Sequence, residues 1–314
     1  MDDDERDQFE YVGLLNHAVA HGDTAQVLEL LANGANVNDK SEFKKFYGWT
    51  PLMFASYYGY SDILRILLDH GANVNDKSMS KKFYGWTPLM FAIDQEHTDI
   101  LRILLNNGAD ANEDLEYREG WTPLTFAAYK GNTNILEILL SKGADIDARE
   151  IDGYTALMIA IRYGQLHIAE YLVENGAHLH FVDRDCGDNV LTLCAEFGNL
   201  HLFDILLVNG ATDINHTACY DMSSLMIAIA NENYDIAKRL IELDCELDFQ
   251  STAPWYRGFT ALMLACFKNN LELVKMLVEN NCDIHIRSEA GETALDIATN
   301  GGHMEIADYL RQFR

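Results

Sequence analysis

Residues 47–75 begin with Tyr47-Gly48-Trp49-Thr50-Pro51-Leu52-Met53-Phe54-Ala55 and end with Gly71-Ala72-Asn73-Val74-Asn75. Between these ends lie Gly59 and the apolar run Ile63-Leu64-Arg65-Ile66-Leu67-Leu68. Almost the same text recurs over residues 84–112, and weaker copies cover the rest of the chain. A fixed period of this kind indicates a repeat architecture, and it decides the fold before any single motif is considered.

Each copy predicts a pair of short helices. Thr50 suits the N-cap of the first helix, and Pro51 suits its first position, where a missing N–H costs nothing. Gly59 can end that helix in a left-handed conformation, and Gly71 can end the second, whose apolar residues recur at helical spacing. Neither helix is long enough to be stable alone in water, so neighbouring copies must stack to bury their apolar faces.

The chain resembles the ankyrin-repeat family, whose repeats carry Thr-Pro-Leu-His-x-Ala in the first helix and Gly-Ala-Asp-Val-Asn after the second. The first motif matches at Thr50-Pro51-Leu52, Thr87-Pro88-Leu89 and Thr122-Pro123-Leu124. The second matches at residues 71–75, 108–112 and 143–147. The resemblance implies an all-α ankyrin-repeat solenoid of about nine helix-turn-helix repeats with projecting loops.

The family histidine is replaced throughout. Its place is taken by Met53, Met90, Thr125, Met158, Thr192, Met226, Met263 and Asp296. We expect packing by the pliable thioether of methionine to substitute, in most repeats, for the hydrogen bonds that the histidine would make.

The pattern predicts a single repeat domain over residues 11–314 that follows an acidic lead-in at residues 1–10. The repeats are expected near residues 11–46, 47–83, 84–118, 119–151, 152–185, 186–220, 221–256, 257–288 and 289–314. Repeats six and seven are the most degenerate, because Asn189-Val190-Leu191 and Ser223-Ser224-Leu225 replace Thr-Pro-Leu. The last helix is more polar on one face, as suits a C-terminal cap.

Acidic residues dominate the composition. The chain has 49 Asp and Glu against 23 Lys and Arg, a formal net charge of −26. This charge disfavours binding to nucleic-acid backbones and to anionic membranes, and it is also what a merely solvated surface would carry. The six cysteines include no CxxC pair, and no signal peptide or membrane-spanning run is recognisable, so we expect reduced thiols and a cytoplasmic protein.

Two loops stand apart from the acidic background. Residues 40–46 and 77–83 lengthen their repeats to 37 residues, against the usual ~33. They hold six of the 23 basic residues, interleaved with aromatic ones. The loop tips predicted to bind a partner are Phe43, Lys44, Lys45, Phe46, Lys81, Lys82 and Phe83, with Trp255 from the long loop after repeat seven. Tandem duplication without a function is the alternative explanation.

The resemblance also implies a concave binding surface, built from loop tips and the exposed side of the first helices. The residues that it places there are Trp49, Tyr57, Tyr58, Trp86, Gln95, Trp121, Tyr129, Lys130, Tyr154, Arg162, Tyr163, Phe197 and Phe259. Tryptophan, tyrosine and arginine dominate protein interface energetics. Simple packing of these rings on the next loop is the alternative.

No catalytic or cofactor-binding motif is recognisable. His178, His180 and His201 lack the helical spacing of a metal site, and no nucleophile elbow, phosphate loop or kinase signature occurs. We therefore expect a non-enzymatic protein without cofactors or a small-molecule substrate, which binds, masks or scaffolds a partner protein. An inhibitor, immunity or effector role is compatible with this. The alternative is an acidic decoy that mimics nucleic acid and occupies a DNA-binding protein.

Overall fold

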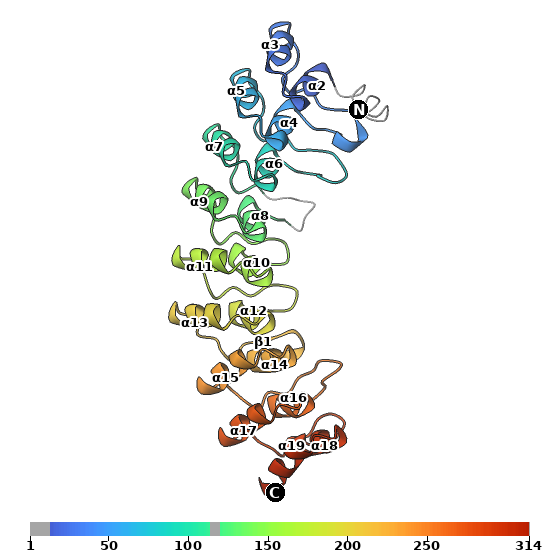
Figure 1. The fold of residues 1–314 in the computed structure, drawn as a ribbon, viewed down its shortest axis with the longest axis vertical. Coiled ribbons are helices and arrows are strands. Elements are labelled where there is room, and N and C mark those ends of the chain that lie inside the picture. The colour runs from blue at the N-terminus through green and yellow to red at the C-terminus, as the bar shows by residue number, and fades with distance from the viewer. Residues whose placement is uncertain (1–12, 114–119, 314) are drawn as a thin grey trace. The chain divides into compact units, whose positions relative to one another are not determined.

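The computed structural model describes residues 13–113 and 120–313, which divide into two compact units (Figure 1). Unit 1 ends at Ile151 and unit 2 begins at Asp152. The acidic lead-in at residues 1–10 lies outside the described residues.

The described residues of unit 1 contain four helix pairs. They are α2 (Leu14–Ala20) with α3 (Thr24–Ala32), α4 (Pro51–Tyr58) with α5 (Ser61–Asp69), α6 (Pro88–Asp94) with α7 (Thr98–Asn106), and α8 (Pro123–Lys130) with α9 (Thr133–Ser141). The first helices α2, α4, α6 and α8 contact one another in succession, and so do the second helices α3, α5, α7 and α9 (Figure 1). A short 3-10 helix, η1 (Lys44–Phe46), lies in the loop between α3 and α4.

Unit 2 contains five pairs of the same kind. They are α10 (Ala156–Arg162) with α11 (Leu166–Glu174), α12 (Val190–Phe197) with α13 (Leu200–Val208), α14 (Ser224–Ala230) with α15 (Tyr234–Glu242), α16 (Ala261–Phe267) with α17 (Leu271–Glu279), and α18 (Ala294–Asn300) with α19 (Met304–Leu310). A small antiparallel bridge pairs β1 (Thr217–Ala218) with β2 (Met222–Ser223) around η2 (Cys219–Asp221), and η3 (Arg311–Phe313) follows α19. These nine helix pairs confirm the predicted all-α repeat solenoid. That the repeats form a single domain remains a prediction.

The helix boundaries follow the predicted capping chemistry. The Thr50 hydroxyl accepts a hydrogen bond from the Met53 backbone N–H, and Pro51 occupies the first turn. Gly59 ends α4 with φ = 84°, a conformation that costs glycine little. A side chain at Gly59 would also collide with the ring of His97, 2.9 Å from the added carbon.

The position of the family histidine divides into two groups. The five methionines there are buried, with Met53 at 0% exposure, which supports the packing expected of the thioether. Thr125, Thr192 and Asp296 behave differently, because each side chain bonds back to the N-cap backbone N–H and completes a capping box. Three repeats thus replace the histidine with a local hydrogen bond.

An asparagine ladder joins neighbouring repeats in unit 1. The Asn75 side-chain amide donates to the Gly108 carbonyl at 3.2 Å, and its oxygen accepts from the Asp110 N–H at 3.1 Å. Asn38 and Asn112 make the equivalent pairs of bonds to the next repeat. These side chains therefore hold the repeats in register at the loops that follow the second helices.

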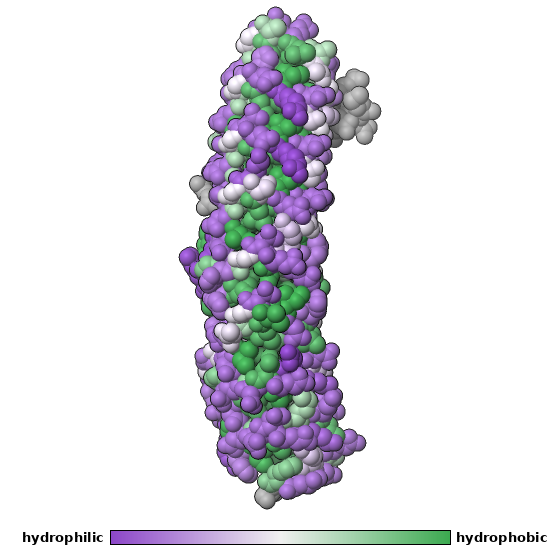
Figure 2. Space-filling view, turned by 90° about the vertical axis from the view of Figure 1, so that its left-hand side faces the viewer, coloured by the Kyte–Doolittle hydropathy of each residue, from purple (hydrophilic) through white to green (hydrophobic). Residues whose placement is uncertain are grey.

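The second helices of each unit are amphipathic. Figure 2, which looks onto this side, shows mainly hydrophilic residues with apolar ones between them. In α5 the residues Ile63, Leu64 and Leu67 are buried, whereas Arg65 is exposed. Among the described residues, no helix is long and apolar enough to cross a membrane.

Candidate functional site

The two long loops of unit 1 close with the same backbone hydrogen bonds. In the first loop the Ser41 N–H donates to the Trp49 carbonyl, and the Gly48 N–H donates to the Ser41 carbonyl, both at 2.8 Å. In the second, Ser78 pairs in the same way with Trp86 and Gly85, again at 2.8 Å. Each loop is therefore a closed structure, and equivalent side chains take equivalent positions one repeat apart.

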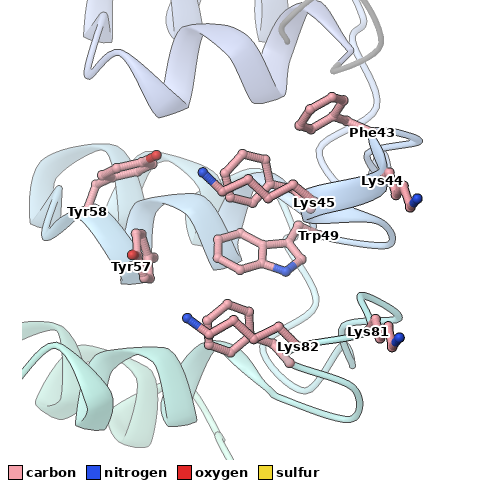
Figure 3. A pocket seen from close by; sticks show the side chains of 10 residues that line it. Phe43, Lys44, Lys45, Trp49, Tyr57, Tyr58, Lys81 and Lys82 are labelled. Carbon is pink, nitrogen blue, oxygen red and sulfur yellow. The ribbon is translucent and has the colours of Figure 1, made fainter. Parts of the chain in front are cut away.

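A lysine lies over a phenylalanine ring in each loop. The Lys45 Nζ is 5.0 Å from the centroid of the Phe46 ring, and the Lys82 Nζ is 4.7 Å from that of Phe83. Such a cation–π contact holds a flexible side chain in one orientation. Figure 3 shows both lysines pointing toward the end of α4 that carries Tyr57 and Tyr58, whereas Lys44 and Lys81 point the other way.

Trp49 lies between the two phenylalanine rings. Its ring centroid is 4.9 Å from that of Phe46 and 5.7 Å from that of Phe83. The indole Nε1 donates to the Ser80 hydroxyl of the second loop at 3.3 Å. This hydrogen bond links the loops of two successive repeats, and the repeat pattern of the sequence does not predict it. Its only signal was that Ser80 and Phe43, at equivalent positions of the two loops, differ.

These side chains surround a groove of about 550 Å³, which we call the loop groove (Figure 3). Its lining consists of Phe43, Lys44, Lys45, Phe46, Trp49, Tyr57, Tyr58, Lys81, Lys82 and Phe83. All ten are residues that the sequence singled out for partner binding. The structure therefore brings the two sets, the loop tips and the aromatic residues of repeat two, into one place.

Two of the tryptophans expected to face a partner, Trp49 and Trp86, are buried. Trp49 is 0% exposed and Trp86 is 2% exposed, and Phe46 retains only 8%. Trp49 packs against Phe54 and Phe91 as well as the loop rings, at centroid distances of 5.0 and 4.3 Å. This corrects the expectation for both tryptophans: a ring without accessible surface supports the groove from beneath and does not reach a partner.

The accessible part of the loop groove combines tyrosine and lysine. Tyr58 is 39% exposed, and burial, followed by the neighbouring Tyr57 and Tyr60, raises its pKa, so its hydroxyl stays protonated. Lys44, Lys45, Lys81 and Lys82 are exposed and make no ion pair with any residue of the described ranges. By contrast, Lys40 and Lys77 pair with Asp76 and Glu113. The groove therefore carries positive charge that unit 1 does not neutralise within its described part.

Further along unit 1 the predicted residues form a polar bridge. The Asp94 carboxylate accepts from the Gln95 amide at 2.8 Å and from the Lys130 ammonium at 3.3 Å. In the same repeat as Lys130, Trp121 is half-buried against Tyr129, which is 37% exposed. These four predicted residues lie outside the lining of the loop groove.

In unit 2 the predicted residues are spread over several repeats. The Arg162 guanidinium donates to the Tyr154 hydroxyl at 2.6 Å and lies over its ring, so this pair is tied together. Tyr154 is 5% exposed, and burial together with Asp183 raises its pKa. Tyr163 and Phe197 are 48% and 46% exposed. They offer separate apolar contacts.

The long loop after α15 holds the last two predicted residues. Trp255 is 80% exposed, whereas Phe259 is half-buried and its ring lies 5.7 Å from that of Tyr256. Phe259 also lines a separate pocket of about 340 Å³ with Phe267 and His303. Trp255 does not line it.

The described residues contain no group of three His, Cys, Asp or Glu that could hold a metal ion. All six cysteines are free thiols. Burial raises the pKa of Cys245, Cys266 and Cys282 to about 12, so these thiols are neutral near pH 7 and poor nucleophiles.

Comparison with protein families gives one result. A family model described as ankyrin repeats (3 copies) matches residues 15–114, 110–183, 175–251 and 225–313. Comparison with individual curated proteins gives no match. Ankyrin repeats generally mediate protein–protein interaction, and proteins built from them are typically non-enzymatic. The chain belongs to the ankyrin-repeat family.

Proposed function

We propose that this chain is a non-catalytic interaction protein that holds its partner protein at the loop groove of unit 1. The main support for this proposal is that one groove of about 550 Å³ is lined by ten residues from two successive repeats. Aromatic anchors surrounded by polar groups are the usual composition of an energetic interface centre. Occupation of this groove would mask or scaffold the partner.

The groove has a packed base and exposed side chains above it, and this arrangement supports the proposal. Trp49, Phe46 and Phe83 form a packed aromatic base, and the Trp49–Ser80 hydrogen bond fixes one loop against the other. The exposed Tyr58 and the lysine side chains then stand on a rigid support. Preorganised side chains lose little conformational entropy on binding, which favours affinity.

A capture experiment with matched variants tests this function. The groove variant carries Lys45→Gln, Tyr58→Ser and Lys82→Gln, all at surface positions. The control variant carries Arg65→Gln and Arg102→Gln, which removes the same positive charge from exposed positions of α5 and α7, also 37 residues apart. Immobilised wild type, groove variant and control are compared by quantitative mass spectrometry of the retained proteins.

We expect a protein retained by wild type and control to be depleted at least about tenfold on the groove variant, since interface centres dominate affinity. Circular dichroism should show equal helicity in all three proteins. A partner retained equally by the groove variant would place the binding surface elsewhere and refute the proposal.

A further inference from the structure

We propose that the loop groove selects an extended acidic segment of the partner protein, with two carboxylates three residues apart. This inference rests on the proposed function and adds the chemistry and the spacing of the ligand. It follows from the charge of the groove, from the distance between its two equivalent halves and from the charge of the rest of the chain.

Charge complementarity identifies the ligand. Lys45 and Lys82 lie over Phe46 and Phe83, point toward the same end of α4 and form no ion pair within the described ranges (Figure 3). A lysine that a ring holds in one orientation, and that has no carboxylate partner among the described residues, offers its charge to a ligand at little entropic cost. Carboxylates are the anionic groups that proteins themselves supply, so an acidic peptide segment fits.

The distance between the two lysine sites sets the spacing. The Phe46 and Phe83 rings flank Trp49, at 4.9 and 5.7 Å, so they cannot be further apart than these two distances combined. Because the two loops are equivalent and lie one repeat apart, their two ammonium groups are offset by about the ~8–10 Å that separates packed helices of adjacent repeats. In an extended polyproline-type segment, residues three apart project on the same side at about 9 Å. The Lys45 and Lys82 sites therefore match carboxylates at positions i and i+3.

The surroundings limit the length of the anion. The chain carries a net charge of −26, and Lys40 and Lys77, at the start of the same loops, are already paired with carboxylates. A long polyanion such as nucleic acid would extend beyond the groove into this acidic field, which disfavours it. A short acidic segment can contact Lys45 and Lys82 without extending into that field. The exposed face of Tyr58 can then pack on an apolar residue between the two carboxylates.

Fluorescence anisotropy with three synthetic peptides tests the inference on the full chain. The first labelled nonapeptide has two glutamates three residues apart, with a proline and a phenylalanine between them. The second has the same composition with the glutamates adjacent, and the third has glutamines in their place. We expect the first peptide to bind at least about tenfold more tightly than either of the others at 150 mM salt.

The loops provide a matched pair of variants. Lys45→Gln with Lys82→Gln should weaken the first peptide at least about tenfold. Lys44→Gln with Lys81→Gln removes the same charge from the same loops, but these side chains point the other way (Figure 3). We therefore expect a loss below about threefold for that variant. Equal losses in both double variants would show unspecific attraction and overturn the proposal, as would equal binding of all three peptides.

Two further measurements test other possible occupants of the loop groove. Displacement of the first peptide by a ten-nucleotide single-stranded DNA at equal concentration would assign the groove to phosphates and overturn the proposal. If the first peptide bound only to a variant that lacks residues 2–10, the occupant of the groove would be the acidic residues of this chain itself. That result would also overturn the proposal. A partner captured through the groove together with failure of all three peptides would refute this inference while leaving the proposed function intact.

Discussion

The loops before α4 in unit 1 and before α16 in unit 2 have the same backbone and different side chains. In unit 2 the Ser251 N–H donates to the Phe259 carbonyl at 3.0 Å, and the Gly258 N–H donates to the Ser251 carbonyl at 2.7 Å. These bonds reproduce those of Ser41 in the first loop of unit 1. With this alignment, Trp255 stands where unit 1 has Lys45.

The difference shows which positions build the loop and which face a partner. The serine and glycine close the backbone, and an aromatic residue lies beneath the tip as Phe46, Phe83 or Tyr256. The tip itself changes from an ammonium in unit 1 to an exposed indole in unit 2. Within the described ranges, only unit 1 has two long loops of this kind in successive repeats. These two loops line one groove together.

The two units also differ in how their repeats are joined. Unit 1 repeats the full asparagine ladder, whereas in unit 2 Asn215 accepts a single bond from Glu246 and Asp248 replaces the asparagine in the next repeat. An aspartate cannot donate to the neighbouring carbonyl as asparagine does. We infer that the loops of unit 1 are held more firmly against one another.

The largest expected effect contrasts two tryptophans. Trp49→Ala should lower the free energy of unfolding by about 3–5 kcal/mol, because it removes a fully buried ring from the aromatic base of the loop groove. Trp255→Ala should change it by less than about 0.5 kcal/mol, since that ring is 80% exposed. Urea unfolding followed by circular dichroism measures both values.

The two tryptophan variants together test whether the loops differ in how firmly they are packed as well as in the side chains they expose. Phe259→Ala is the intermediate case, because Phe259 is half-buried and occupies in unit 2 the position that Trp49 has in unit 1. Comparable losses for Trp255→Ala and Trp49→Ala would contradict the contrast, since they would mean that the exposed indole contributes as much packing as the buried one.

A smaller effect is expected from the ladder. Asn75→Ala removes one donated and one accepted inter-repeat bond and should cost about 1–2 kcal/mol. Asn215→Ala removes only the bond from Glu246, so about half that loss is expected. Hydrogen exchange at the Asp110 amide should accelerate in the Asn75 variant. Unchanged exchange there would show that water replaces the bond without loss, and the ladder would then not explain any firmness of unit 1.

The fold could be predicted from the sequence because residues close together in the chain specify each repeat. Thr50, Pro51 and Gly59 specify where a helix begins and ends, and their recurrence specifies the stack. The members of the loop groove were also predictable, since duplication of a loop one repeat apart places like residues side by side. Unit 2 keeps the threonine N-cap at Thr155, Thr260 and Thr293 but has no proline at the first position of these helices.

The burial of the tryptophans was not predictable in this way. Trp49 is enclosed by Phe83 of the second loop and by Phe91 of the next helix pair, so its exposure depends on how successive loops and helix pairs pack. The Ser80 hydroxyl that accepts its N–H also lies in the second loop. A pattern within one repeat cannot distinguish a ring that faces a partner from one that faces its neighbour.

The smallest expected effect concerns an acidic site of unit 2 that has no counterpart in the loop groove. Asp188 is 7% exposed, and its pKa is raised above the usual 3.8, first by burial and then by the Asp183 carboxylate, against the opposing effects of Thr192 and His216. Because the folded state binds this proton more tightly than the unfolded state, stability falls as pH rises above 3.8 through the folded pKa. The cost of the buried charge is therefore fully present at pH 7.

Asp188→Asn should remove that cost and raise the free energy of unfolding at pH 7 by less than about 1 kcal/mol. The gain should vanish below pH 3.8, where aspartic acid and asparagine are both neutral. Asp235→Asn, at an exposed position of α15, removes the same charge away from the buried site and controls for the change in net charge. A gain for Asp188→Asn that persists at low pH would come from altered hydrogen bonding with Asp183 and not from the charge, and unit 2 would then lack the electrostatic penalty that separates it from unit 1.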